Sequence, residues 1–148
     1  MYEKLKDNCN IFIIIKPSKV QGDIIKEVMN LFNTDCYLFL KMKLEYVFVR
    51  EFYHHVSELP IYNDMTNYLS SFESIVMMVK YNNRTPLTLK QMKKYIRNKY
   101  QPIGNRSYEN IIHISDDMRE GKHEINLFYD YYLRDYDNCD NIEDKQSK

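Results

Sequence analysis

Runs of consecutive apolar residues predict the central strands of this chain. Residues 11–15 and 74–79 are rich in β-branched and other apolar side chains, which is typical of strands buried on both faces. Residues 36–44 alternate in part between apolar and polar side chains and predict a further strand. Residues 124–129 are a candidate for the fourth. The pattern therefore indicates a sheet of four short strands.

Apolar residues three and four positions apart predict helices between these strands. One helix is expected from Gly22 to Phe32, and a pair of shorter helices over 47–56 and 62–69. Thr85 followed by Pro86 is a helix start signal, because proline fits the first helical position.

This next helix is expected to run to about Arg97, and Ser115 is expected to cap another that includes residues 118–122. The order of elements favours an α+β sandwich of the ferredoxin-like, split βαβ type. We expect a four-stranded antiparallel sheet with helices over one face. One domain would span residues 1–140, and the polar residues 141–148 would form a disordered tail.

Amino-acid composition argues against several classes of protein. The 148 residues can form one sizeable core, and 21 basic residues balance 21 acidic ones. No overall basic field therefore argues for nucleic acid or an anionic membrane. Three distant cysteines predict reduced thiols, and no apolar run is long enough to cross a bilayer. With no signal peptide at the N-terminus, we expect a cytoplasmic protein.

Residues 110–117, Asn-Ile-Ile-His-Ile-Ser-Asp-Asp, carry the strongest indication of chemistry. They place His113 just before an expected helix start at Ser115, and helix N-termini attract anions. A histidine nucleophile beside an anion site indicates phosphoryl chemistry. The alternative is a partly buried histidine at the end of a strand. Lys16 also has a functional and a purely structural interpretation. It directly follows a buried strand, where a lysine is notable, but it could simply be a solvated residue at the strand end.

Two motifs resemble the nucleoside diphosphate kinase family. Residues 13–20, Ile-Ile-Ile-Lys-Pro-Ser-Lys-Val, resemble its first strand and Lys-Pro exit. Residues 110–116 resemble the segment whose histidine becomes phosphorylated. Weaker similarities extend the resemblance from about Asn10 to Cys139, at residues 22–26, 51–53, 123–128 and 135–139. The chain is identified as a divergent member with a shortened loop before the histidine segment.

The resemblance implies a ping-pong reaction through a phosphohistidine. A nucleoside triphosphate would donate its γ-phosphoryl group to His113, and a nucleoside diphosphate would then collect it. Glu124 would hold one imidazole nitrogen, with support from Ser115. Lys16 would reach the phosphates, and Tyr53 would lie near the reacting group.

The same resemblance implies the nucleotide contacts and the partners. Asn110 would contact the sugar hydroxyl, and Ile61 and Met65 would pack against the base. Mg²⁺ would bridge the nucleotide phosphates without a protein cage. The partners would be nucleoside di- and triphosphates and further copies of the chain, in a homo-oligomer that is a hexamer or a tetramer. Neither a membrane nor nucleic acid is an expected partner.

Several positions depart from the family pattern. Ile114 stands where the family has a small residue, and Ile61 where it has an aromatic one. Lys93 falls where a helical arginine is expected, and lysine lacks the bidentate fork. Arg106 is the best candidate for a second, loop arginine. Two other cations could substitute in space: Arg84 and Arg97.

Three hypotheses follow. We favour an active kinase, because the nucleophile and its supports are present. The alternative is a catalytically impaired fold that serves as an oligomeric interaction module, which the altered phosphate contacts would explain. A nucleic-acid-binding domain ranks last, because the strands lack paired aromatic residues. The motivation for this last hypothesis is a basic stripe of Lys90, Lys93, Lys94 and Arg97. The alternative interpretation of the stripe is an ordinary solvated helix face.

Overall fold

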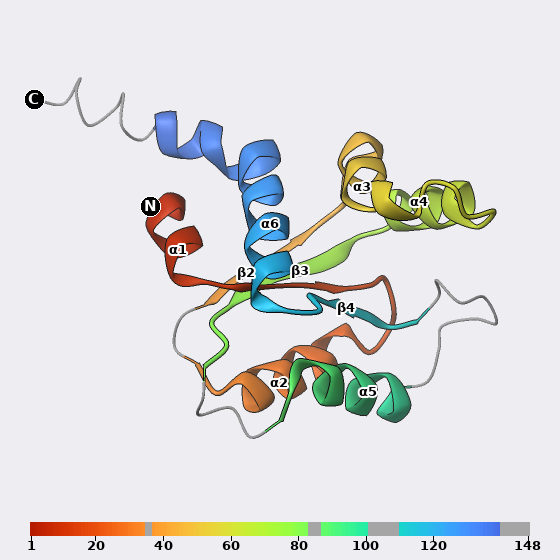
Figure 1. The fold of residues 1–148 in the computed structure, drawn as a ribbon, viewed down its shortest axis with the longest axis horizontal. Helices are drawn as coiled ribbons and strands as arrows, with labels where there is room; N and C mark the ends of the chain where they lie inside the picture. Colours follow the sequence, from red (N-terminus) through yellow and green to blue (C-terminus); the bar gives the residue numbers. More distant parts are fainter. Residues whose placement is uncertain (35–36, 83–86, 101–109, 140–148) are drawn as a thin grey trace, which may run out of the picture.

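The computed structural model describes residues 1–34, 37–82, 87–100 and 110–139. The elements follow the chain in this order: α1 (Tyr2–Asn8), β1 (Ile11–Ile15), α2 (Gln21–Phe32), β2 (Tyr37–Met42), α3 (Tyr46–Phe52), the 3₁₀ helix η1 (His54–Val56), α4 (Tyr62–Ser71), β3 (Ser74–Val79), α5 (Leu89–Lys99), β4 (Ile112–Ile114), α6 (Met118–Phe128) and the π-helical η3 (Tyr129–Leu133) (Figure 1). Several sequence predictions lie outside the described residues: Cys36, Arg84, Thr85, Pro86, Arg106 and the tail at 141–148.

The four strands form an antiparallel sheet in the order β2-β3-β1-β4. Strand β1 pairs with β3 from Ile11 opposite Val79 to Ile15 opposite Ile75. On its other side, Ile14 lies opposite His113 of β4. Strand β3 lies between β1 and β2, and β1 lies between β3 and β4. Both strand–helix–strand units are therefore split by another strand, which confirms the ferredoxin-like fold.

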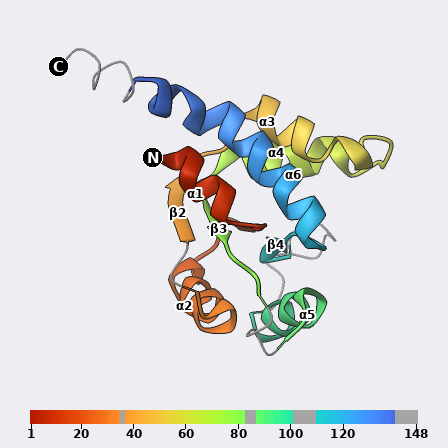
Figure 2. The same cartoon turned by 60° about the vertical axis from the view of Figure 1, so that its left-hand side comes forward.

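Helices cover both faces of the sheet (Figures 1 and 2). Helices α2 and α5 lie on one side, and α1, α3, α4 and α6 lie on the other. Side chains alternate along β1, so Ile13 enters the core with α2 and α5, whereas Phe12 enters the core with α3 and α6. The expectation of one covered face is wrong, because a strand that is apolar on both sides must be buried on both sides.

The fourth strand is Ile112–Ile114, and the prediction of a strand over 124–129 is wrong. Most of that stretch belongs to α6, whose buried Gly121, Ile125 and Phe128 recur at helical spacing. Asp117 is the N-cap of this helix, and its side chain accepts the Glu120 N–H at 2.7 Å. Local capping and the longer helical period thus override the short apolar run at its end.

Two helix starts also differ from the prediction. Ser115 is not an N-cap, because its hydroxyl is buried beside β1 and accepts the Phe12 N–H at 2.9 Å. Helix α5 is capped by Thr88 through a capping box with Gln91, rather than by Thr85. Each start lies three or fewer residues from the predicted one, and the buried side chains of α5 are still Leu89, Met92 and Ile96.

Helix α1 was not predicted, because none of its residues is fully buried and it has no apolar stripe. Tyr2 and Leu5 are only partly buried against the core, and a polar contact adds to this packing. The N–H groups of Tyr2 and Glu3 donate to the buried Asp137 carboxylate at 2.9 and 2.7 Å, and the Tyr129 hydroxyl donates at 3.0 Å. The C-terminal helical segment therefore anchors the first helix.

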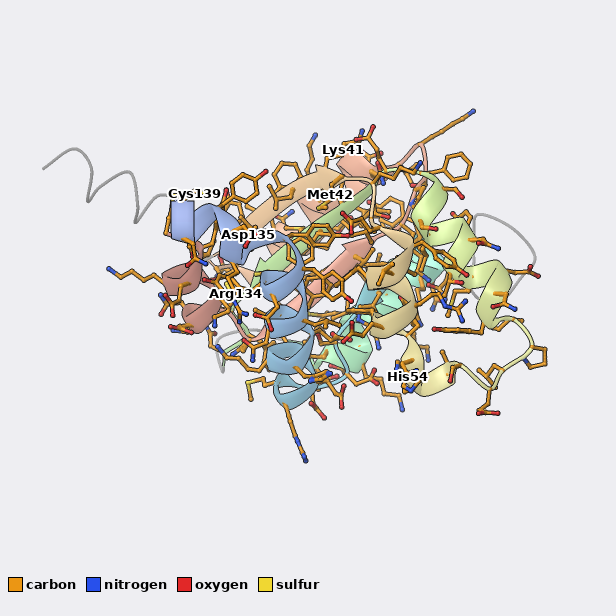
Figure 3. The ribbon with its side chains drawn as sticks, turned by 90° about the horizontal axis from the view of Figure 1, so that it is seen from above. Lys41, Met42, His54, Arg134, Asp135 and Cys139 are labelled. Carbon is orange, nitrogen blue, oxygen red and sulfur yellow. The ribbon has the colours of Figure 1, made fainter. Side chains whose placement is uncertain are left out.

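None of the helices within the described ranges combines the length and the apolar character needed to cross a membrane. Cys9 is buried and Cys139 is exposed, and neither forms a disulfide with another described residue. Figure 3 views the α6 side of the sheet, with Cys139 at the far end of the C-terminal helix and His54 where α3 leads into η1.

Candidate active site

The alternation of side chains along β4 decides which face of the sheet His113 points to. Ile112 and Ile114 enter the core with α2 and α5, so His113 points to the opposite face, toward α3 and α6. There its ring meets Phe52 edge-on, with centroids 5.1 Å apart, and Tyr53 edge-on at 6.1 Å. Two aromatic side chains from α3 and its C-cap therefore restrict the imidazole on one side.

Glu124 holds the imidazole on another side. Its two carboxylate oxygens lie 3.2 and 3.0 Å from His113 Nε2. The Ser115 hydroxyl lies 2.6 Å from Glu124 Oε1 and donates to it. Because a carboxylate only accepts, Nε2 carries the proton and Nδ1 keeps its lone pair. Among the described residues, Nδ1 has no hydrogen-bond partner.

Gly121 lets α6 come close enough for this contact. A Cβ at this position would lie 1.9 Å from the carbonyl oxygen of Asn10, so no other residue fits without movement of the backbone. Helix α6 therefore lies directly against the start of β1. Glu124 follows Gly121 by three residues, which keeps it on the same side of the helix and over the sheet.

His113 lines a cleft of about 220 Å³ together with Lys16, Tyr53, Arg97 and Asn110. The remaining described lining residues are a histidine and an apolar wall from η1 and α4: His55, Val56, Leu59, Ile61 and Met65. The structure thus brings six predicted site residues to one cleft, where cations and the imidazole face apolar side chains.

Lys16 is buried at the end of β1 beside Asn110. Its Nζ donates to Asn110 Oδ1 at 2.8 Å. Burial, with a smaller effect of Arg97, lowers the pKa of Lys16 to about 7. An anion bound beside Lys16 would favour the charged ammonium and reverse this shift. The side chain is therefore suited to bind phosphate and is weakly charged without it.

Arg97, rather than Lys93, is the cation that α5 contributes to this cleft. Its guanidinium donates from Nε and Nη2 to the carbonyl of Ile112, at 3.3 and 2.9 Å. That anchor lies next to His113 in the chain. Lys93 instead donates to Asp116 Oδ1 at 2.6 Å and lines a neighbouring cleft. The structure does not bring Lys93 to His113, and Arg106 lies outside the described residues.

Comparison with known proteins agrees with this geometry. The family model described as nucleoside diphosphate kinase matches residues 10–132. The chain belongs to this family. It is 28% identical over 130 residues to a nucleoside diphosphate kinase of Acetivibrio thermocellus, which covers 79% of this chain and 93% of that protein. It is 25% identical over 127 residues to one from Methanocaldococcus jannaschii, with coverage of 80% and 91%.

Solved structures of nucleoside diphosphate kinases share the fold. The Aquifex aeolicus enzyme aligns with a TM-score of 0.58 at 18% identity, over 80% of this chain and 92% of that chain. The Encephalitozoon cuniculi enzyme aligns with a TM-score of 0.59 at 23% identity, over 80% and 86%. Family membership supports phosphate transfer between nucleotides in general.

Two expected departures from the family pattern have a structural explanation. Ile114 is fully buried opposite Ile13 in the strand pairing. Its backbone φ is not positive, because Asn33 is the one described non-glycine residue with a positive φ. A β-branched side chain therefore fits the strand backbone at position 114. Ile61 lines the cleft itself. Tyr62 does not replace it, because its buried hydroxyl donates to the Arg50 carbonyl at 2.6 Å.

Sequence reasoning missed part of the cleft in this family member. It considered Arg97 only as a possible substitute and did not single out His55, Val56 or Leu59. These three follow Tyr53 within six residues, in the stretch where helical spacing breaks down. The available signal was that an irregular segment directly follows a predicted site residue. Which way this segment turns depends on its packing against α4, and the sequence pattern does not show that packing.

Proposed function

We propose that this protein transfers the γ-phosphoryl group of a nucleoside triphosphate to a nucleoside diphosphate through a phosphohistidine at His113. One observation carries the proposal. Glu124 occupies Nε2, which leaves Nδ1 as the nucleophilic nitrogen in a cleft that also contains Lys16 and Arg97. A nucleophile, its orienting carboxylate and two cations are the components that phosphoryl transfer needs.

In the first half-reaction, Nδ1 of His113 attacks the γ-phosphorus. A P–N bond forms as the P–O bond to the leaving nucleoside diphosphate breaks, and the oxygen departs with the electron pair. Glu124 stabilises the positive charge that develops on the imidazole. Lys16 and Arg97 stabilise the negative charge on the transferring group. In the second half-reaction, a terminal oxygen of another nucleoside diphosphate attacks the phosphorus and His113 is released.

Tyr53 would donate to the transferring group as a neutral phenol. Burial, and secondarily Glu124, raise the pKa of Tyr53, whereas Arg97 opposes this. The hydroxyl therefore keeps its proton throughout the physiological range. It acts as a hydrogen-bond donor and not as a second anion beside the phosphates.

Nucleoside binding would rely on apolar contact. Ile61 and Met65 would pack against the base, and Asn110 would contact the sugar hydroxyl. Isoleucine stacks on a base less strongly than an aromatic ring does, and its side chain has no group that could hydrogen-bond to the edge of a base. Broad nucleobase use with modest affinity is the expected consequence.

Mg²⁺ would enter with the nucleotide. Within the described residues, no group of three or more His, Cys, Asp or Glu side chains is arranged to hold a metal ion. Near His113, Glu124 is engaged by Ser115 and the imidazole, and Asp116 by Lys93. A Mg²⁺ ligated by phosphate oxygens and water fits this donor set. When bound, it would supply positive charge that neutralises part of the charge on the phosphates.

We also propose a homo-oligomer, a tetramer or hexamer, in which the edge strand β2 pairs with the same strand of another copy. Tyr37 and Phe39 on this strand are 42% and 46% exposed, and an apolar edge favours a symmetric contact. Light scattering should give a mass several times that of the chain, and Phe39→Lys should reduce it. A monomeric wild-type protein would contradict this.

The decisive test of function is incubation with ATP labelled at the γ-phosphate. Wild-type protein should acquire a label that is labile in acid and stable in alkali, and His113→Ala should acquire none. His123→Ala is the matched control, because His123 is exposed on α6, and it should be labelled normally. No label on wild type, together with no stabilisation by nucleotide, would favour the interaction module instead.

A further inference from the structure

A second cleft, of about 560 Å³, lies beside the candidate active site. Its volume is in the range of small-molecule sites. In the part of the chain that the structure describes, its lining is four cations, one amide and one carboxylate: Lys90, Lys93, Lys94, Arg97, Asn98 and Asp116. None of these side chains is aromatic or aliphatic. The composition selects for a compact anion and offers no aromatic or aliphatic side chain on which a base could stack.

Positive charge is concentrated here although the chain as a whole is balanced. Helix α5 carries five basic residues and no acidic one, against 21 of each sign overall. Lys93 is paired with Asp116. Lys90 and Lys94 form no ion pair with any other described residue. Cations at this helical spacing repel one another, and a bound polyanion would relieve that repulsion.

Arg97 connects the two clefts, because it lines both of them. Its anchor on the Ile112 carbonyl holds the guanidinium between His113 and the lysines. Asp116 adds a second link: its carboxylate accepts from Lys93 and lies close enough to His113 and Arg97 for both to lower its pKa, after the larger effect of Lys93. Charge placed in the lysine cleft therefore acts on the groups that face substrate phosphates.

We propose that the lysine cleft is a second anion site, which binds a short polyphosphate chain without its nucleoside and weakens substrate binding through Arg97. The ligand would be inorganic triphosphate or the phosphate chain of a second nucleotide. Several lysines suit it, because each ammonium is a compact donor for phosphate oxygens. A bound chain competes for Arg97, and the coupling is reciprocal. This coupling rests on the proposed function, whereas anion binding itself does not.

Calorimetric titration with inorganic triphosphate tests the site. The protein should carry Lys16→Met, so that the active-site cleft contributes little. We expect one triphosphate per chain, with affinity that falls steeply with salt. The double variant Lys90→Gln/Lys94→Gln should bind about tenfold or more weakly. The control Lys4→Gln/Lys26→Gln removes two exposed lysines elsewhere and should change affinity less than about twofold.

Three probes identify the ligand. ATP and triphosphate should bind the Lys16→Met protein with similar affinity, because the cleft reads only phosphates. Binding of ATP but not triphosphate would overturn the proposal, since the nucleoside would then be required. Tighter binding of a single-stranded oligothymidylate than of triphosphate would also overturn it, and would indicate a nucleic-acid surface.

The coupling is tested with wild-type protein. Saturating triphosphate should weaken ADP binding about fivefold, and the Lys90→Gln/Lys94→Gln variant should lose this effect while His113 is still labelled by ATP. If triphosphate binds but leaves ADP affinity unchanged, the regulatory part of the proposal fails. Triphosphate should still bind to His113→Ala, which cannot be labelled. This result would show that the second anion site exists whether or not the phosphotransfer proposal is correct.

Discussion

At the scale of single residues, the candidate site depends on which imidazole nitrogen is occupied. Glu124 and Ser115 form a short relay that ends on Nε2 of His113. The sequence indicated His113 and Lys16 through their motifs, because each motif is continuous in the chain. It did not indicate which ring nitrogen would be held, since that depends on the rotation of α6 over β4.

Glu124→Gln should slow formation of the phosphohistidine about 100-fold, because an amide neither balances the charge on the imidazole nor fixes a single tautomer. Rapid-quench measurement of labelled protein gives the rate. The affinity for ADP should stay nearly unchanged, since Glu124 does not contact the nucleotide in the proposed complex. Glu120→Gln, on an exposed part of the same helix, is the control and should react at the wild-type rate.

Lys16 should make nucleotide binding depend on pH. Its pKa is about 7 in the empty cleft, and a bound phosphate should raise the pKa again. Binding therefore takes up a proton above pH 7, and ADP affinity should fall by up to about tenfold per pH unit as pH rises. Below pH 7, Lys16 is already charged and contributes no dependence.

Titration calorimetry at pH 8, in buffers of different ionisation enthalpy, should show uptake of about one proton. Lys16→Arg keeps a permanent charge, so its affinity should not fall over the same range. Equal slopes for wild type and Lys16→Arg would exclude Lys16 as the titrating group.

At the scale of elements, the predictable ones have a strong local signal. Strands β1 and β3 are continuous apolar runs, and α2 has a clear amphipathic period, so each was found close to its observed bounds. Strand β4 has only three residues and α6 has a mixed surface, so the sequence pattern predicted the first part of α6, missed β4 and assigned residues 124–129 to a strand. Pairing of β4 with β1 and the close approach at Gly121 decide both elements.

Gly121→Ala should lower the free energy of unfolding by about 3 kcal/mol, because the new methyl group would overlap the Asn10 carbonyl and push α6 from the sheet. Urea denaturation measures this change. The variant should also label more slowly, since Glu124 moves with the helix.

Gly22→Ala is the matched substitution. A Cβ there meets nothing within 4 Å in the first turn of α2, so stability should rise by about 0.5–1 kcal/mol. A loss of stability at Gly22 similar to that at Gly121 would contradict this explanation, because the close approach to another part of the backbone exists only at Gly121.

At the scale of the whole molecule, topology assembles the cleft. Lys16 follows β1, and His113 lies on β4, which pairs with β1. The split βαβ order therefore places residues nearly a hundred positions apart at one end of the sheet. The segment from η1 to α4 then supplies the apolar wall from the side.

Nucleotide binding should stabilise this assembly as a whole. Mg²⁺ with ADP at a hundred times its dissociation constant should raise the melting temperature by about 5–10 °C. Differential scanning calorimetry measures the shift, and Lys16→Met should reduce it strongly. An unchanged melting temperature for wild type would favour the non-catalytic interaction module.

The sequence by itself determined the class of fold and indicated the candidate site residues His113 and Lys16, because these residues and the central strands are encoded in short, continuous patterns. Tertiary structure alone decided which cation of α5 joins them. Lys93 and Arg97 lie one turn apart on the same helix face, so spacing cannot separate them. The contact between α5 and β4 brings Arg97 to the Ile112 carbonyl and leaves Lys93 with Asp116, and such long-range packing has no local signature.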